Sequence, residues 1–185
     1  PRQDTEVLVE EALKRIQPGM RVLDMCTGSG CIAVSIAKNV PHIEMHAVDI
    51  SKQALNVAKD NAKLNEVSVE FERSDLFDHV AGKYDVIVSN PPYIPTSEIP
   101  KLMPEVGSFE PVEALDGKED GLYFYRKIIA ECKDYLNPDG MIFFEIGYEQ
   151  GADVSALLQE AGFSQVAVVK DLAHLDRVVF GKMIE

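Results

Sequence analysis

The sequence RVLDMCTGSGCIAVSIAKN, residues 21–39, decides the fold. Its first five residues form a short, mainly apolar run that predicts a buried strand. Residues 26–30 are rich in glycine and predict a tight turn, and residues 31–39 place apolar side chains at helical spacing. A strand, a glycine-rich turn and a helix in this order are typical of a βαβ unit, in which a helix joins parallel strands.

Strands and helices alternate through most of the remaining chain. We expect further strands over residues 44–50, 67–71, 84–89, 141–146, 165–170 and 177–183, and helices over residues 5–16, 51–65, 119–136 and 150–161. Residues 137–140, Asn-Pro-Asp-Gly, predict a turn, and residues 94–118, with four prolines and no periodicity, predict a long loop. The alternation indicates an α/β fold: a seven-stranded, mostly parallel sheet with helices on both faces and one antiparallel strand.

Length and cysteine usage point to a single domain over residues 1–185 in a reducing compartment. The three cysteines lack paired spacing and the histidines are scattered, so we expect neither a disulfide framework nor a metal site, and a cytoplasmic protein. No apolar run reaches the ~18 residues that a membrane span needs. Because the chain opens with Pro1 and not Met, we interpret it as a fragment of a longer protein.

The chain is strongly acidic. Asp and Glu total 31 against 18 Lys and Arg, which gives a net charge of −13. Such a domain repels phosphate backbones, so we expect no direct nucleic acid partner. We also expect a monomer without membrane contact.

Ser89-Asn90-Pro91-Pro92-Tyr93 ends the strand predicted over residues 84–89 and carries the chemistry. Neither proline has an N–H group, so this corner offers carbonyl acceptors and few donors, and the Asn90 side-chain oxygen adds an acceptor. Acceptors in this number suit a planar NH2 group, against which the Tyr93 ring could lie flat. The corner therefore indicates an amide or amino-purine site, the alternative being an ordinary proline-rich loop.

Residues 28–33 fit the dinucleotide pattern G-x-G-x-x-A, and Asp49 lies about 20 residues on, where a ribose-binding carboxylate is expected. Asp24, however, would oppose a pyrophosphate and favour a cationic ligand such as S-adenosylmethionine, whose carboxylate could use the helix N-terminus at Gly30. Alternatives remain: Asp24 as a helix-dipole partner, Asp49 as a strand-end cap, and Asp75-Leu76 as either an adenine pocket or a plain loop.

The chain resembles the glutamine-N5 methyltransferases of the HemK/PrmC type that modify peptide-chain release factors. The matching segments are residues 1–6, 22–30, 90–93, 110–111, 114–117, 120–122, 145–147, 170–172 and 176–177. The resemblance implies a class I S-adenosylmethionine-dependent methyltransferase (Rossmann-like) fold that lacks a helical N-terminal domain here. Departures from the family pattern are Cys26 and Lys118, where glycine is usual, and Gln3, where proline is usual.

The resemblance also implies site residues. The cofactor would contact Cys26, Thr27, Gly28, Ser29, Gly30 and Asp49, together with Asp75, Leu76 and Asn90. The substrate glutamine would contact Asn90, Pro91, Pro92 and Tyr93, of which Asn90, Pro91 and Tyr93 would be catalytic.

The predicted reaction transfers a methyl group to the N5 nitrogen of the glutamine in the Gly-Gly-Gln motif of a class I peptide-chain release factor, and leaves S-adenosylhomocysteine. Three alternatives use the same residues differently. They are an adenine-N6 methyltransferase of DNA or RNA, a nicotinamide oxidoreductase, and a non-catalytic module that binds the cofactor.

Overall fold

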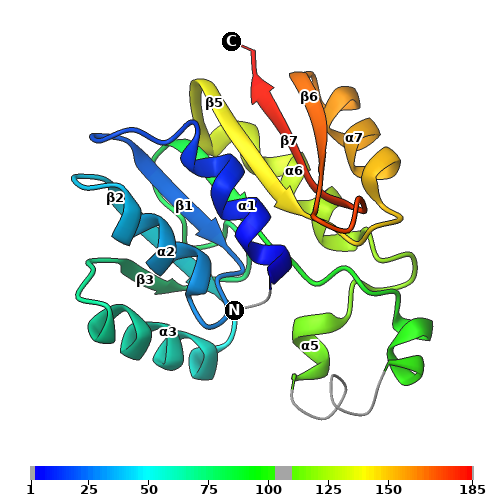
Figure 1. Cartoon of the computed structure of the whole chain (residues 1–185), viewed down its shortest axis with the longest axis horizontal. Helices are drawn as coiled ribbons and strands as arrows, with labels where there is room; N and C mark the ends of the chain where they lie inside the picture. The colour runs from blue at the N-terminus through cyan, green and yellow to red at the C-terminus, as the bar shows by residue number, and fades with distance from the viewer. Residues whose placement is uncertain (1–2, 103–109, 185) are drawn as a thin grey trace.

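The computed structural model describes residues 3–102 and 110–184, and one seven-stranded sheet lies at its centre (Figure 1). In chain order the strands are β1 (Arg21–Met25), β2 (Glu44–Asp49), β3 (Glu70–Arg73), β4 (Tyr84–Ser89), β5 (Leu136–Glu145), β6 (Phe163–Lys170) and β7 (Asp176–Met183). They lie in the order β3-β2-β1-β4-β5-β7-β6, and only the pairs that include β7 are antiparallel. The predicted mostly parallel sheet with one antiparallel strand is therefore confirmed.

Helices cover both faces of this sheet (Figure 1). The helices are α1 (Gln3–Leu13), α2 (Cys31–Asn39), α3 (Lys52–Leu64), α5 (Val112–Leu115), α6 (Tyr123–Cys132) and α7 (Gly151–Glu160), with 3-10 turns η1 (Thr96–Lys101) and η2 (Lys133–Tyr135). Side chains of α1 and α2 share one apolar cluster with the sheet, and side chains of α6 and α7 share the other. None of the helices in the described part of the chain is long and apolar enough to cross a membrane.

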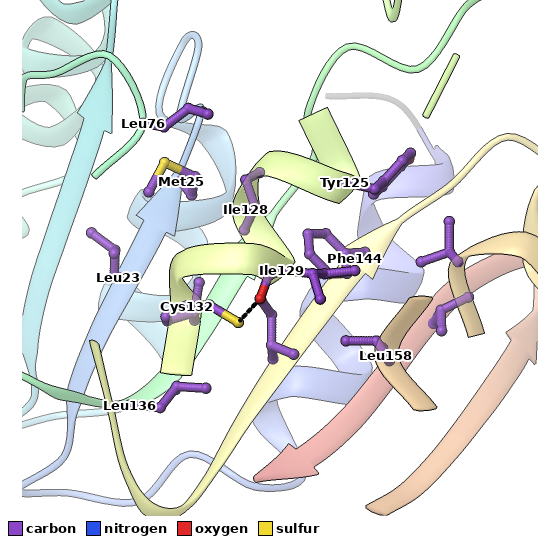
Figure 2. Close-up of a cluster of buried hydrophobic side chains, with 14 of the residues drawn as sticks. Leu23, Met25, Leu76, Tyr125, Ile128, Ile129, Cys132, Leu136, Phe144 and Leu158 are labelled. Carbon is purple, nitrogen blue, oxygen red and sulfur yellow. Dashed lines mark hydrogen bonds between the residues drawn. The ribbon is translucent and has the colours of Figure 1, made fainter. Parts of the chain in front are cut away.

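The cluster beneath α6 is the larger block of the core (Figure 2). Leu23 and Met25 of β1 face Ile128 of α6, while Tyr125 lies beside Phe144 of β5. Burying each such aliphatic or aromatic side chain stabilises the fold by roughly 1.5–3 kcal/mol. The Tyr125 hydroxyl donates a hydrogen bond of 2.7 Å to the backbone carbonyl of Glu145, so this buried polar group is satisfied.

The third strand lies further along the chain than residues 67–71, where we expected it. β3 spans Glu70–Arg73, and its parallel pairing with β2 places Glu70 opposite His46 and Arg73 opposite Asp49. The Val67 N–H instead bonds to the carbonyl of Ala62 at 3.1 Å and closes the end of α3. The beginning of α3 is as expected, since the Ser51 side chain accepts a hydrogen bond from the Ala54 N–H.

The helix predicted over residues 119–136 was too long at both ends. At its start, Gly121 has φ of 78° and the Asp120 carboxylate accepts the Leu122 N–H, a turn that delays α6 to Tyr123. At its end, the chain tightens into η2, and Leu136 already pairs with Tyr84 of β4.

The turn predicted over residues 137–140 lies inside β5. Leu136 pairs with Tyr84 and Met141 with Val86, so these four residues form an irregularity between two paired positions. Pro138 has no N–H to give to the ladder and Asp139 has φ of 65°, which explains why the segment leaves the regular strand path.

Candidate active site

The glycine-rich turn and the Asn-Pro-Pro-Tyr corner leave the sheet side by side. β1 and β4 are neighbours, and Met25 is paired with Ser89, the last residue of each strand. The sheet continues from β1 to β2 and from β4 to β5 in opposite directions, so both segments start at the switch point of the strand order (Figure 1). Open α/β sheets bind ligands in the crevice at this position, outside the carboxyl ends of the strands.

Backbone hydrogen bonds fasten the glycine-rich turn to the end of β2. The Thr27 N–H donates to the Val48 carbonyl, and the Gly28 N–H donates to Asp49 Oδ2, both at 2.9 Å. Gly28 has φ of 55°, and a Cβ added there would meet nothing within 4 Å. The turn therefore presents bare backbone to open space, which allows a ligand to approach closely.

Helix α3 supports the turn from the other side. A Cβ on Gly30, whose φ is 80°, would lie 2.8 Å from the Cβ of Ala58, so only glycine fits between α2 and α3. The Asn61 side chain donates to the Ser29 carbonyl at 2.9 Å. Sequence reasoning missed Asn61, because a polar residue within an amphipathic helix carries no signal of the loop that it contacts.

Asp24 lies beneath the turn and is fully buried. Its Oδ2 accepts a hydrogen bond of 2.6 Å from the Thr27 hydroxyl, while Oδ1 is buried without a hydrogen-bond partner among the described residues. Burial raises the pKa of the carboxyl group to about 7, against the opposing effect of the Thr27 hydrogen bond. The site thus contains a buried carboxyl oxygen that has no partner among the described residues, on a group that releases its proton less readily than an exposed aspartate.

Asp49 performs the strand-end role that we had considered for it, and it retains acceptor capacity. Oδ2 accepts the Gly28 N–H and Oδ1 accepts the Ser51 N–H at 2.9 Å. A carboxylate offers about four lone-pair positions. Ribose hydroxyls could therefore still bind to it, and Asp49 as a cofactor ligand stays a prediction.

Asp75 and Leu76 follow β3 next to Asp49, because the Ser74 N–H donates to the Asp49 carbonyl at 3.0 Å. Asp75 is exposed, whereas the Leu76 side chain belongs to the core cluster (Figure 2). Of the two predicted cofactor contacts, Asp75 is thus the more accessible.

Three carboxyl groups lie close enough to the Cys26 thiol to affect its pKa. Burial raises the pKa of this thiol, and the negative charges of Asp49, Asp24 and Asp75 raise it further. Negative charge near the turn disfavours a pyrophosphate and favours a cationic ligand. In the described ranges, no group of three or more His, Cys, Asp or Glu side chains is placed to hold a metal ion.

The Asn90 corner offers acceptors beside this region. The buried Ser89 hydroxyl donates to the Met25 carbonyl at 2.6 Å and fixes the base of the corner to β1. Asn90 is half-buried, and its carboxamide makes no hydrogen bond to the residues that the structure describes. Pro91 is buried and Pro92 half-buried, and neither has an N–H group. The corner can thus receive a planar NH2 group.

Tyr93 is held by a residue that sequence reasoning missed. Gln150 Nε2 donates to the Tyr93 carbonyl at 2.9 Å, from the turn between β5 and α7. The Tyr93 ring packs against the core cluster, with Cδ1 3.3 Å from the position of a Cβ on Gly147. The protein itself therefore covers part of the Tyr93 ring surface. Stacking of this ring on a substrate amide stays a prediction. A polar residue just after a central strand is a signal that could have pointed to Gln150.

The segment predicted as a long loop after the corner contains η1 and α5. Ile94 forms an isolated parallel bridge with Asp116, in which the Ile94 N–H donates to Leu115 and the Gly117 N–H donates to Ile94. Residues 103–109 of the loop lie outside the described residues.

The sheet order, the glycine-rich turn and the acceptor corner define a class I methyltransferase, and residues 3–103 match the family model described as methyltransferase small domain. The release factor glutamine methyltransferase of Thermodesulfovibrio yellowstonii is 46% identical over 97% of this chain and 66% of that protein. For that of Bacillus cereus the values are 41%, 99% and 68%. The chain belongs to the release factor glutamine methyltransferase family.

A solved structure agrees with this family. The protein-(glutamine-N5) methyltransferase (release factor-specific) of Alicyclobacillus acidocaldarius is 34% identical, with a TM-score of 0.61 over 100% of this chain and 94% of that one. The chain spans about two thirds of the length of the two curated relatives.

Proposed function

We propose that this chain transfers a methyl group from S-adenosylmethionine to the side-chain N5 nitrogen of a glutamine, in the Gly-Gly-Gln motif of a class I peptide-chain release factor. The observation that carries the proposal is the position of the Asn90 carboxamide, which makes no hydrogen bond within the described part of the chain and follows Ser89, the residue paired with Met25 at the start of the glycine turn. The names of the relatives favour a release factor as the substrate.

The turn suits this cofactor. When bound, S-adenosylmethionine supplies an electrophilic methyl group on a sulfonium and leaves as S-adenosylhomocysteine. Asp49 and Asp75 provide negative charge that favours its sulfonium and ammonium groups, and Asp24 adds to this charge where its carboxyl group is deprotonated. The first turn of α2 has no side-chain cap at Gly30, so its backbone N–H groups can receive the carboxylate of the cofactor.

The corner suits an amide nitrogen, which is a poor nucleophile because its lone pair is delocalised. The Asn90 side-chain oxygen and the Pro91 carbonyl would each accept one amide hydrogen, which fixes the direction of the nitrogen and favours the positive charge that develops on it. Positioning of this kind can lower a barrier by roughly 7–11 kcal/mol. Residues 89–93 include no carboxylate or imidazole, so we expect the amide proton to pass to water after transfer.

The test is methyl transfer from labelled S-adenosylmethionine to a purified release factor, with its Gln→Ala variant and an adenine-containing oligonucleotide as parallel substrates. Label on the glutamine-containing protein alone supports the proposal. Label on the Gln→Ala variant contradicts the site of transfer, and label on the oligonucleotide indicates an adenine-N6 enzyme. Cofactor binding without transfer to any substrate would indicate a non-catalytic domain.

A further inference from the structure

We propose that Gln150 is a positioning residue for the methyl transfer: its carboxamide holds the acceptor corner in place by joining three separate segments of the chain. The inference rests on the proposed function of the same site. It concerns how the corner is kept rigid, and it assigns a role to a residue that does not belong to the Asn-Pro-Pro-Tyr sequence.

Both N–H groups of the Gln150 carboxamide and its oxygen are engaged in hydrogen bonds. Nε2 donates to the Tyr93 carbonyl at 2.9 Å and to the Gly121 carbonyl at 3.2 Å, and Oε1 accepts the Gly147 N–H at 2.9 Å. These three partners lie in the corner after β4, in the segment before α6 and in the turn after β5. One side chain therefore fixes three backbone segments relative to one another.

The backbone around the Gln150 carboxamide is closely packed, so that no side chain fits at two neighbouring glycines. A Cβ added at Gly121 would lie 2.5 Å from the Tyr93 carbonyl oxygen and 2.8 Å from Gln150 Nε2. A Cβ added at Gly117 would lie 2.8 Å from the Tyr93 carbonyl carbon. The segment 117–121 therefore lies directly against the Tyr93 backbone, and two glycines are required for that approach.

The corner is consequently anchored at both ends. Ser89 is fixed to β1 through its hydroxyl, and Tyr93 is fixed by Gln150. Between these anchors, the proline rings restrict φ of Pro91 and Pro92. The backbone of Asn90 and Pro91 is thus held between two anchors, the Ser89 and Gln150 side chains, which would not touch the substrate. A displacement of about 1 Å in a reacting group can cost ~10²-fold in rate.

Two substitutions separate positioning from bulk stability. Gln150→Glu keeps the shape and an acceptor for Gly147, but it places an oxygen where Nε2 now faces two carbonyl oxygens. Gln150→Met keeps the length and removes all three hydrogen bonds. Gln159→Glu, at an exposed position of the same helix α7, is the matched control for the change of charge.

We expect Gln150→Glu and Gln150→Met to lower kcat on the release factor about 10²-fold. The dissociation constant and stoichiometry of S-adenosylmethionine, measured by titration calorimetry, should stay within twofold of the unsubstituted chain, and Gln159→Glu should behave like that chain. Unchanged kcat in both Gln150 variants overturns the proposal. A loss of kcat that follows a loss of cofactor-binding stoichiometry also overturns it, because that pattern reports unfolding.

Amide hydrogen exchange tests the same role without any activity. The Ile94 and Gly117 N–H groups bond across the corner, at 3.0 and 2.8 Å, and Gln150→Met should expose them to faster exchange than Gln159→Glu does. Equal exchange in the two variants overturns the positioning role. Absence of methyl transfer by the unsubstituted chain, with exchange still accelerated in Gln150→Met, would contradict the proposed function and leave the positioning role standing.

Discussion

Asp24 is a buried carboxyl group whose protonation makes the free energy of unfolding depend on pH. Its pKa is raised to about 7 in the folded chain, from the ordinary value of 3.8, because burial disfavours the charged form. Between these two values the folded chain holds a proton that the unfolded chain has released. The free energy of unfolding therefore falls as pH rises through this window, by up to ~1.4 kcal/mol per pH unit.

We expect Asp24→Asn to remove this part of the pH dependence, because the amide does not titrate. Urea unfolding at pH 5 and pH 8 measures the difference, and Asp60→Asn, at an exposed position of α3, is the control. Parallel loss of stability from pH 5 to pH 8 in Asp24→Asn and the unsubstituted chain would contradict the assignment.

Asn90→Ala should lower turnover about 10²–10³-fold, which is the usual effect of deleting one oriented polar group. Cofactor affinity should be retained, because Asp49 and the glycine turn are untouched. Single-turnover rates and calorimetric titration measure the two quantities separately. Turnover equal to that of the unsubstituted chain would remove Asn90 from the mechanism.

Several site residues could be predicted from the sequence because their signals are local. The glycine turn, Asp49 and Asn90 each follow a recognisable strand, and the structure brings these strand ends together. The contacts of the supporting residues Asn61 and Gln150 could not be predicted, because their backbone partners lie 32 and 57 positions away in the chain. Such contacts depend on the sheet order and not on a nearby pattern.

At the scale of elements, the approach of α2 to α3 depends on Gly30. Gly30→Ala should destabilise the fold through two separate terms: about 1–2 kcal/mol for left-handed backbone in a residue with a Cβ, and roughly 1–3 kcal/mol for contact with Ala58. Gly28→Ala is the matched control, since it has φ of 55° and no neighbour within 4 Å, and it should show the first term alone.

Chemical denaturation of Gly30→Ala, Gly28→Ala and the Gly30→Ala/Ala58→Gly pair measures these terms. Relative to Ala58→Gly alone, adding Gly30→Ala should cost only about as much as Gly28→Ala does. An undiminished Gly30→Ala effect in the paired variant would show that the contact with Ala58 is not the cause.

Helices and strands with a strong hydrophobic pattern were predicted well, but the residues at which some of them begin and end were not. The runs at 21–25 and 84–89 are buried strands, as apolar continuity indicated. The helix over 119–136 was overextended because Gly121 and Leu136 obey tertiary constraints: a close approach to Tyr93 and pairing with Tyr84. Neither constraint can be recognised from the residues that are adjacent in the sequence.

At the scale of the whole molecule, the charge of −13 disfavours nucleic acid binding by simple electrostatics, and the expectation of no nucleic acid partner stays a prediction. We expect no retardation of a double-stranded oligonucleotide by micromolar protein at about 0.15 M salt. An electrophoretic mobility assay, with a basic DNA-binding protein of similar size as the control, measures this. A retarded band would favour the adenine-N6 alternative.

The alternation of strands and helices was sufficient to predict a mostly parallel sheet. It was not sufficient to predict which strands are neighbours, and the site depends on that order. Because β4 lies next to β1 and not next to β3, the corner and the glycine turn meet at one switch point. The cytoplasmic location and monomeric state stay predictions.

Cys26 adds a last consequence of this carboxylate-lined site. Alkylating agents and peroxides attack the thiolate, and burial together with Asp49, Asp24 and Asp75 raises the pKa of this thiol. Burial also raises the pKa of Cys31 at the start of α2. Both cysteines beside the cofactor turn thus remain protonated at neutral pH. We therefore expect neither thiol to react readily with peroxides or alkylating agents at neutral pH.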